Sequence, residues 1–266
     1  MFVEHIPVNA ETIVNAIKSY YPNGRINLDE VKKNKLYNFV TLFGIRLETC
    51  DSGLMDDAIG GIRLRKSLTP LADDYWEIIL SNATTDPTPF WLLNSTDPIP
   101  AKYGTAWVVE GQYRFYPAGN FKGYPSFRPV DPITCYRWKP SKEEIKKAKA
   151  TGKPLSSFFE AAKARGEVKI IEPTETILIH RSWGSSSKNS AGCQVFSDNS
   201  ALSRLYNWAL LHNSLYKTPQ KTPVPLIYTL LTKTQFVTPN QSYSVSPIKE
   251  KTSIFIKNAT LNFLNF

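Results

Sequence analysis

A histidine and a cysteine thirteen residues apart are the side chains best suited to covalent chemistry in this sequence. His180 ends a run of apolar and β-branched residues, and Cys193 follows Gly192 shortly before a predicted helix. A cysteine attacks a carbonyl carbon as the thiolate, so it needs a base within reach. A histidine at a strand end and a cysteine after a loop rich in Gly and Ser can meet in space. The spacing therefore allows His180 to act as a base for Cys193, but it does not by itself assign these roles.

The glycine before the cysteine favours the same chemistry. Glycine has no side chain, so the backbone at Gly192 can approach a reacting carbonyl group closely. The N–H groups of Gly192 and Cys193 can then point at the carbonyl oxygen as an oxyanion hole, which stabilises the charge that develops there. On spacing alone, a free cysteine is more often a small buried apolar residue, and that interpretation stays open.

The segment around these residues resembles the active-site motif of the YkuD-type L,D-transpeptidase catalytic domain. In that family a histidine at a strand end is followed, after a variable loop, by Ser-His-Gly-Cys. His180, Ser190, Gly192 and Cys193 match this pattern. The resemblance implies a mainly β catalytic domain that acts on peptidoglycan.

Three upstream segments extend the resemblance to a branch in tailed phages and bacteria, which typically ends in Ser-Ala-Gly-Cys-Gln. These segments are Thr84-Thr85-Asp86-Pro87, Gly104-Thr105-Ala106 and Gly111-Gln112-Tyr113, and the resemblance covers about residues 37 to 235. It implies a hydrolase or a transpeptidase in a phage virion, associated with its tail, or in the bacterial cell envelope.

The resemblance also implies a role for each matching residue. The thiolate of Cys193 would attack a peptide carbonyl next to a D-centre in a peptidoglycan stem peptide, with His180 as the base. The backbone carbonyl of Arg181 would orient the imidazole, and Ser190 would fix the loop. The N–H groups of Gly192 and Cys193 would form the oxyanion hole. No cofactor and no metal ion are implied.

Three further residues are expected to contact the substrate: Gln194, Trp183 and Tyr113. Gln194 follows the nucleophile directly, and Trp183 follows the base by three positions. An aromatic side chain in a β protein is a core residue by default, so a core position stays open for Trp183 and for Trp107.

Some positions depart from the family motif and support a second hypothesis. Ala191 stands where the motif has histidine, and Val195 stands where arginine is common. Residues 119–123, where the phage branch tends to carry a histidine, contain none. The alternative is a non-catalytic structural or adaptor protein of a virion that retains the fold. Its partners would be other virion proteins or copies of this chain, docked by strand addition through the extension from about residue 237.

Short apolar segments bounded by Pro, Gly, Asn or Asp predict a mainly β (α+β) fold, an L,D-transpeptidase-like sandwich or barrel with a few peripheral helices. The 19 prolines fit many turns and strand edges. The expected strands are residues 38–48, 75–80, 90–93, 107–116, 133–138, 176–180 and 227–231. The expected helices are residues 10–20, capped by Asn9 with Ile13, Ile17 and Tyr20 on one face, and residues 199–212, capped within 198–200. Residues 38–48 alternate as a half-buried strand does.

Three regions are expected along the chain. Residues 1–36 form an N-terminal helical segment, residues 37–236 a catalytic domain, and residues 237–266 a C-terminal extension. Within the domain, residues 141–169 form a basic helical insertion that starts at a capping box of Ser141 and Glu144. Two roles are equally open for this insertion. It could be a lid that guides an anionic wall polymer, or a surface hairpin with a solvated face.

Composition narrows the class of protein. The 266 residues are 42% hydrophobic with a net charge of +9, an ordinary globular balance. Residues 141–169 carry +4 and residues 217–266 carry +5, so the rest of the chain is neutral. Localised charge without a DNA- or RNA-binding motif makes nucleic acid an unexpected partner. Neither a membrane span nor a signal peptide is expected.

The other reactive groups are expected to have structural roles or to be solvated. His212 is expected to be structural, with a partly charged imidazole that complements the end of its helix. The acidic pairs Asp56-Asp57 and Asp73-Asp74 are expected to lie in solvated turns rather than to bind a cation. Cys50 and Cys135 are expected to be core or edge residues.

Overall fold

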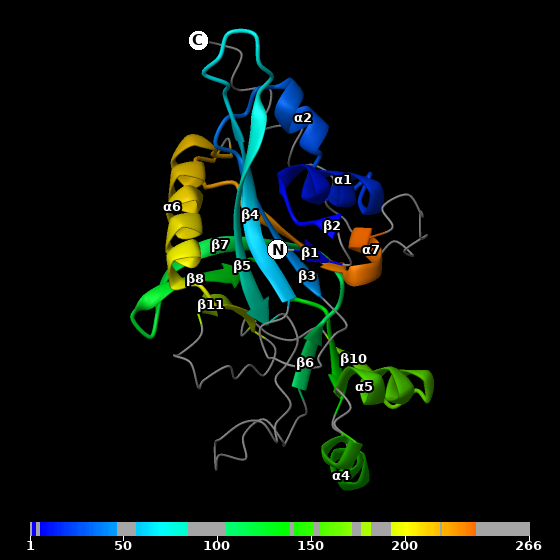
Figure 1. The fold of residues 1–266 in the computed structure, drawn as a ribbon. Coiled ribbons are helices and arrows are strands. Elements are labelled where there is room, and N and C mark those ends of the chain that lie inside the picture. Colours follow the sequence, from blue (N-terminus) through cyan, green and yellow to red (C-terminus); the bar gives the residue numbers. More distant parts are fainter. Residues whose placement is uncertain are drawn as a thin grey trace.

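The protein is seen here in a computed structural model, which describes residues 2–3, 6–46, 57–84, 105–138, 141–151, 155–171, 177–181, 193–218 and 220–237 (Figure 1). Eight strands close into a barrel in the order β11-β12-β5-β4-β3-β13-β7-β8. Their bounds are β3 Val40–Arg46, β4 Asp57–Arg65, β5 Tyr75–Thr84, β7 Gly111–Phe121, β8 Tyr124–Pro129, β11 Ile179–Arg181, β12 Gln194–Phe196 and β13 Leu226–Thr232. Barrel closure leaves no free sheet edge among these strands.

Two smaller sheets and six helices complete the described part of the chain. A three-stranded sheet has the order β10-β9-β6, and β1 pairs with β2. The strands are β1 Phe2–Val3, β2 Ile6–Pro7, β6 Thr105–Val108, β9 Cys135–Trp138 and β10 Lys169–Ile171. The helices are α1 Ala10–Tyr20, α2 Leu28–Lys33, α4 Lys142–Thr151, α5 Leu155–Ala164, α6 Asn199–Leu215 and α7 Lys233–Val237. The expectation of a mainly β fold with a few helices is confirmed.

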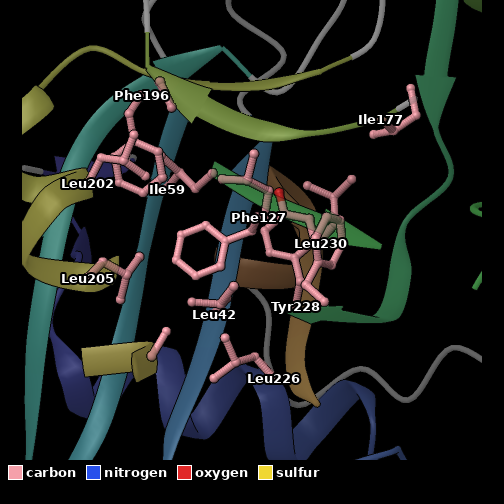
Figure 2. Close-up of a cluster of buried hydrophobic side chains, with 14 of the residues drawn as sticks. Leu42, Ile59, Phe127, Ile177, Phe196, Leu202, Leu205, Leu226, Tyr228 and Leu230 are labelled. Atoms are coloured by element: carbon pink, nitrogen blue, oxygen red, sulfur yellow. The ribbon is translucent and has the colours of Figure 1, made fainter. Parts of the chain in front are cut away.

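One hydrophobic core joins the inward-facing side chains of the barrel to helix α6. Leu202 and Leu205 of α6 point toward Phe127 and Leu42 (Figure 2). The helix approaches so closely that a Cβ on Gly61 of β4 would overlap a methyl group of Leu205. Helix α6 also lies against β3, β4, β5, β7, β8, β11 and β12, so it holds most of the barrel together.

A second core covers the other face of β3, β4 and β13. Helices α1, α2 and α7 lie on the opposite side of these strands from α6 (Figure 1). Along β3, Leu42 belongs to the inner core, whereas Phe43 and Ile45 belong to the outer one. Every residue of β3 is buried, so the half-buried strand expected there is wrong because helices cover its outer face as well.

The N-terminal helix follows the sequence prediction closely. Helix α1 spans Ala10–Tyr20, and the Asn9 side chain accepts a hydrogen bond from the N–H of Thr12 at 3.0 Å. Ile13, Ile17 and Tyr20 are buried on its inner face. A capped helix whose apolar positions repeat every three to four residues carries enough local information to be identified without tertiary context.

The strand expected over residues 107–116 is two strands in different sheets. Strand β6 ends at Val108 and β7 begins at Gly111. The break is held from outside, because Arg46 donates to the carbonyl of Val108 at 3.0 Å and pairs with Glu110 at 2.7 Å. A partner 62 residues distant in sequence redirects the chain, and no local pattern reports it.

The basic insertion forms the expected helical pair. Ser141 and Glu144 make the predicted capping box, with each side chain accepting from the other's backbone N–H. Phe159 and Ala162 of α5 pack on Trp138 of β9 in a small separate core. The expected strand at residues 90–93 and the extension from residue 237 fall outside the described residues, apart from Val237 itself.

A glycine in the centre of β4 is expected to be intolerant of substitution. A Cβ on Gly60 would overlap the carbonyl oxygen of Ile79 on the paired strand, so Gly60→Ala must shift the backbone. We expect a loss of about 2–3 kcal/mol in the free energy of unfolding, measured by chemical denaturation. The control is Gly111→Ala in β7, because its Cβ would lie at an ordinary 3.5 Å from Tyr113. Equal stability of the two variants would contradict the packing argument.

Candidate functional site

The strands β11 and β12 bring the predicted base and nucleophile into one region. They pair in parallel, with His180 opposite Val195 and Ile179 opposite Gln194. The N–H of Gln194 donates to the carbonyl of Leu178 at 2.8 Å, which fixes the register at the start of β12. Cys193 therefore lies across from Leu178, two residues before the histidine on the neighbouring strand.

The cysteine sulfur is held against the backbone of β11. The N–H of Leu178 donates to Cys193 Sγ at 3.5 Å.

Ile179 and Phe196 join the inner core of the barrel. Because side chains alternate along a strand, His180 and Val195 project to the outer face. The structure therefore places the imidazole outside the packed interior, on the strand that contacts the thiol.

His180 has a defined orientation. Its Nδ1 lies 2.7 Å from the carbonyl oxygen of Arg181. A carbonyl oxygen only accepts hydrogen bonds, so Nδ1 carries the proton and Nε2 keeps its lone pair. This contact is the one that the resemblance implied for Arg181. An imidazole held in this tautomer can take up a proton at Nε2.

Burial keeps His180 neutral at physiological pH. The side chain is only 5% exposed, and this burial lowers its pKa below the ordinary 6.5. The Arg181 carbonyl raises the pKa in part, and the positive charge of Lys122 lowers it further. A neutral imidazole is the form that can act as a base.

Burial shifts the pKa of the Cys193 thiol in the opposite direction. It raises the pKa of Cys193 above the ordinary 9.0, and the N–H of Leu178 offsets this only in part. At neutral pH the resting pair is thus a thiol and a neutral imidazole, not a preformed thiolate–imidazolium ion pair. Chemistry at this site needs proton transfer during the attack itself.

The tip of the β7–β8 hairpin forms a rim beside the histidine. The ring of Phe121 lies 5.3 Å from the imidazole of His180. The guanidinium of Arg181 lies 3.2 Å from the ring centre of Tyr124, and β8 and β11 run side by side (Figure 1). Together with Lys122 this makes a rim with two cationic side chains. The rim includes residues 119–123, the segment in which the sequence lacked the expected histidine.

Two of the three expected substrate contacts lie elsewhere. Gln194 is fully buried, and its Oε1 accepts from the Tyr228 hydroxyl at 2.8 Å inside the barrel. Its side chain has no surface to offer a substrate, which corrects the expectation. Tyr113 donates its hydroxyl to the carbonyl of Val109, near the start of β7. Phe121, at the opposite end of that strand, is the residue that contacts His180.

Three other predicted residues fall outside the described part of the chain: Ser190, Gly192 and Trp183. Sequence reasoning missed Phe121, Lys122 and Tyr124, whose place beside His180 depends on the pairing of β8 with β11. The sequence signal for this place was the resemblance to the phage branch, which tends to carry a histidine at residues 119–123.

Other titratable residues lie outside this region. Within the described ranges no three His, Cys, Asp or Glu side chains gather as a metal site. Asp57 is 2% exposed at the start of β4, so the solvated turn expected there is wrong for this residue. His212 is structural as expected, but burial lowers its pKa to about 4, so the expected partial charge is wrong. Cys135 is a core residue.

Comparison with known proteins identifies no relative: no family model, curated protein or solved structure matches the chain. None of the helices in the described segments is long and apolar enough to cross a membrane. The chemistry of the His180 and Cys193 region is therefore the basis for any assignment.

The pH dependence of thiol modification tests the electrostatics of the site. Because burial raises the pKa of Cys193, we expect its alkylation by iodoacetamide to be slow at neutral pH. The rate should keep rising beyond pH 9.0, the ordinary value. Peptide mass mapping over a pH series measures this rate for each cysteine. A plateau reached below pH 7 would show a preformed thiolate and contradict the description.

Proposed function

We propose that this chain is a cysteine acyl-transfer enzyme of the L,D-transpeptidase type that acts on peptidoglycan stem peptides. The observation that carries the proposal is the hydrogen bond between His180 Nδ1 and the Arg181 carbonyl, on the strand that also contacts Cys193 Sγ. A tautomer fixed with the proton on Nδ1, so that Nε2 keeps its lone pair, is what a general base requires. A virion or the cell envelope is the proposed location.

The reaction divides into two acyl transfers. His180 Nε2 takes the proton from Cys193 Sγ as the sulfur attacks a peptide carbonyl carbon, which forms a tetrahedral intermediate. The carbon–nitrogen bond then breaks, the imidazolium gives its proton to the leaving amine, and a thioester remains. Attack by water would complete a hydrolysis, and attack by an amine a transpeptidation. In either case His180 removes the proton from the attacking group and returns it to the sulfur.

The charged rim supports an anionic substrate. Lys122 is exposed, and Arg181 is partly exposed beside Tyr124. Both cations lie on the hairpin side of His180, where stem peptides with free carboxylates would approach. Charges at the mouth of a site raise the local concentration of an oppositely charged substrate.

Incubation with purified sacculi tests the proposal. Wild-type protein should change the muropeptide profile, whereas Cys193→Ala should leave it unchanged. A carbapenem, which acylates thiols of this type, should add its mass to the peptide that contains Cys193. The matched control is Cys135→Ala, which removes a core thiol and should retain the activity. Identical muropeptide profiles for wild type and Cys193→Ala, together with an unlabelled Cys193, would refute the proposed enzymatic activity.

A second candidate is a structural or adaptor protein of a virion. The observation that favours it is that burial raises the pKa of Cys193 and lowers that of His180, so the resting pair is uncharged. Such a protein would show neither turnover nor acylation, but would enter a stable assembly with virion proteins. Size-exclusion chromatography and cryo-EM of the native assembly distinguish it from a free, thiol-reactive monomer.

A further inference from the structure

The loop that joins β4 to β5 carries the most exposed large apolar side chains in the described part of the chain. Leu68 and Leu71 are each 99% exposed, and Tyr75 at the start of β5 is 51% exposed. Figure 1 shows this loop as the far tip of a long hairpin that projects beyond the barrel, with α2 beside it. Single exposed apolar residues are ordinary, but two fully exposed leucines on a projecting tip are not.

The tip is an ordered turn. The N–H of Ala72 donates to the carbonyl of Thr69 at 3.0 Å, which closes a β-turn with Pro70 at its second position. At the base, Asp74 accepts from the N–H of Ser67 at 3.1 Å and from the Tyr37 hydroxyl at 2.9 Å. The leucines are therefore presented by a fixed scaffold, and little conformational entropy is lost when they are bound.

Exposed lysines lie near the base of this tip. Lys32, in the last turn of α2, and Lys35, just after that helix, lie near enough to Asp74 to lower its pKa. Lys66 is exposed on the hairpin itself, and Lys33 is exposed on α2. Lys33 pairs with Glu30 and Arg65 with Glu77, so Lys32, Lys35 and Lys66 are the exposed cations that can face anionic headgroups.

We propose that the β4–β5 tip docks on an anionic lipid bilayer, with Leu68 and Leu71 inserted at the interface and the lysines against the headgroups. Apolar residues that enter the headgroup boundary, beside cations that face anionic lipid, are the two elements of peripheral membrane binding. Tyr75, half-exposed at the start of β5, is an amphipathic aromatic residue of the type that gathers in such interfaces.

A protein partner fits this feature less well. A stable protein interface buries roughly 800 Å² on each side over a broad complementary patch. Two leucines on a narrow turn offer far less area than that. A bilayer needs no matching surface, so a small exposed apolar tip with lysines beside it is sufficient. The proposal is independent of the chemistry at Cys193.

Vesicle flotation with the full chain tests the docking. Wild type should float with vesicles that contain phosphatidylglycerol and not with vesicles of phosphatidylcholine alone. Leu68→Ser/Leu71→Ser should weaken the partition by about tenfold or more, because the inserted apolar surface is lost. Lys32→Gln/Lys66→Gln should weaken it about 30-fold, since each lysine near an anionic surface strengthens binding about fivefold.

The matched control changes two other exposed leucines. Leu210 and Leu211 on α6 are 48% and 39% exposed, and Leu210→Ser/Leu211→Ser should bind as wild type does. Absence of wild-type flotation would overturn the proposal. So would equal binding by the tip variant, which would assign the binding to basic segments elsewhere. If wild type does not float but self-associates, and the tip variant does not self-associate, the tip binds a protein partner instead.

Discussion

Replacement of His180 by glutamine is expected to lower the rate of Cys193 acylation by about 10²–10⁴-fold, the usual contribution of a general acid–base group. Glutamine can still donate to the Arg181 carbonyl, which the His180 Nδ1 reaches at 2.7 Å, but it offers no basic nitrogen for the thiol proton. The measurement is the rate of carbapenem adduct formation on Cys193, followed by intact mass. Unchanged thermal unfolding would show that the loss is chemical.

The pH profile gives this prediction a second, independent readout. Burial and Lys122 both lower the pKa of His180, so activity should persist at pH values below the ordinary 6.5 and fall only once the imidazole becomes protonated. In Lys122→Met a neighbouring positive charge is removed, the imidazolium becomes less unfavourable, and the acidic limb should move to higher pH. Lys122 lies on the exposed hairpin tip, so its substitution should not alter folding.

Two outcomes would contradict the base assignment. Activity retained within a few fold in His180→Gln would mean that another group removes the thiol proton. An acidic limb that does not move in Lys122→Met would mean that the limb belongs to a different residue. Lys163→Met on α5 is a matched charge control, because that lysine lies over Tyr136 of the separate small sheet.

Local sequence information was sufficient where an element carries its own start and stop. Helix α1 and the capping box of Ser141 and Glu144 could be predicted because a capping side chain and a periodic apolar face are adjacent in sequence. The roles of His180 as base and Cys193 as nucleophile came from the resemblance and stay a prediction. The structure places His180 on β11 and Cys193 directly before β12, the strand that pairs with β11 in parallel.

Other elements depend on partners distant in sequence and could not be predicted. Strand β4 could not be predicted because Gly60 and Gly61 interrupt its apolar pattern. In the fold, these two glycines allow close packing against β5 and α6. Strand β12 is three residues long and gains its identity only from β11 and β5. The rim beside His180 likewise requires the contact between β8 and β11. In each case the informative neighbour is a tertiary one.

His212 shows how a burial pattern decides the role of a titratable side chain. Its Nδ1 accepts from the N–H of Val40 at 3.1 Å, so Nε2 carries the proton and donates to the carbonyl of Val224 at 3.1 Å. The rings of Phe39 and Tyr216 pack against the imidazole. The His212 side chain thus links α6, β3 and the segment that leads into β13. It has no exposed surface itself.

Replacement of His212 by phenylalanine is expected to lower the free energy of unfolding at pH 7 by about 2–5 kcal/mol. The ring volume is nearly kept, but the buried N–H of Val40 and the partly buried carbonyl of Val224 lose their partner. An unpaired buried group costs about 1–3 kcal/mol, and the partly buried carbonyl falls at the lower end of that range. Urea unfolding followed by circular dichroism measures the change. Ser214→Ala, on the exposed side of the same helix, should leave stability within about 0.5 kcal/mol of wild type.

The same contacts predict acid sensitivity with a definite sign. Burial lowers the pKa of His212 from 6.5 to about 4, so the unfolded chain binds the proton more readily than the folded one. The stabilisation is complete above pH 6.5 and is lost as the pH falls toward 4, at up to about 1.4 kcal/mol per pH unit. In His212→Phe this part of the pH dependence should vanish. If wild type and variant lose stability in parallel between those two pH values, the titrating group is not His212.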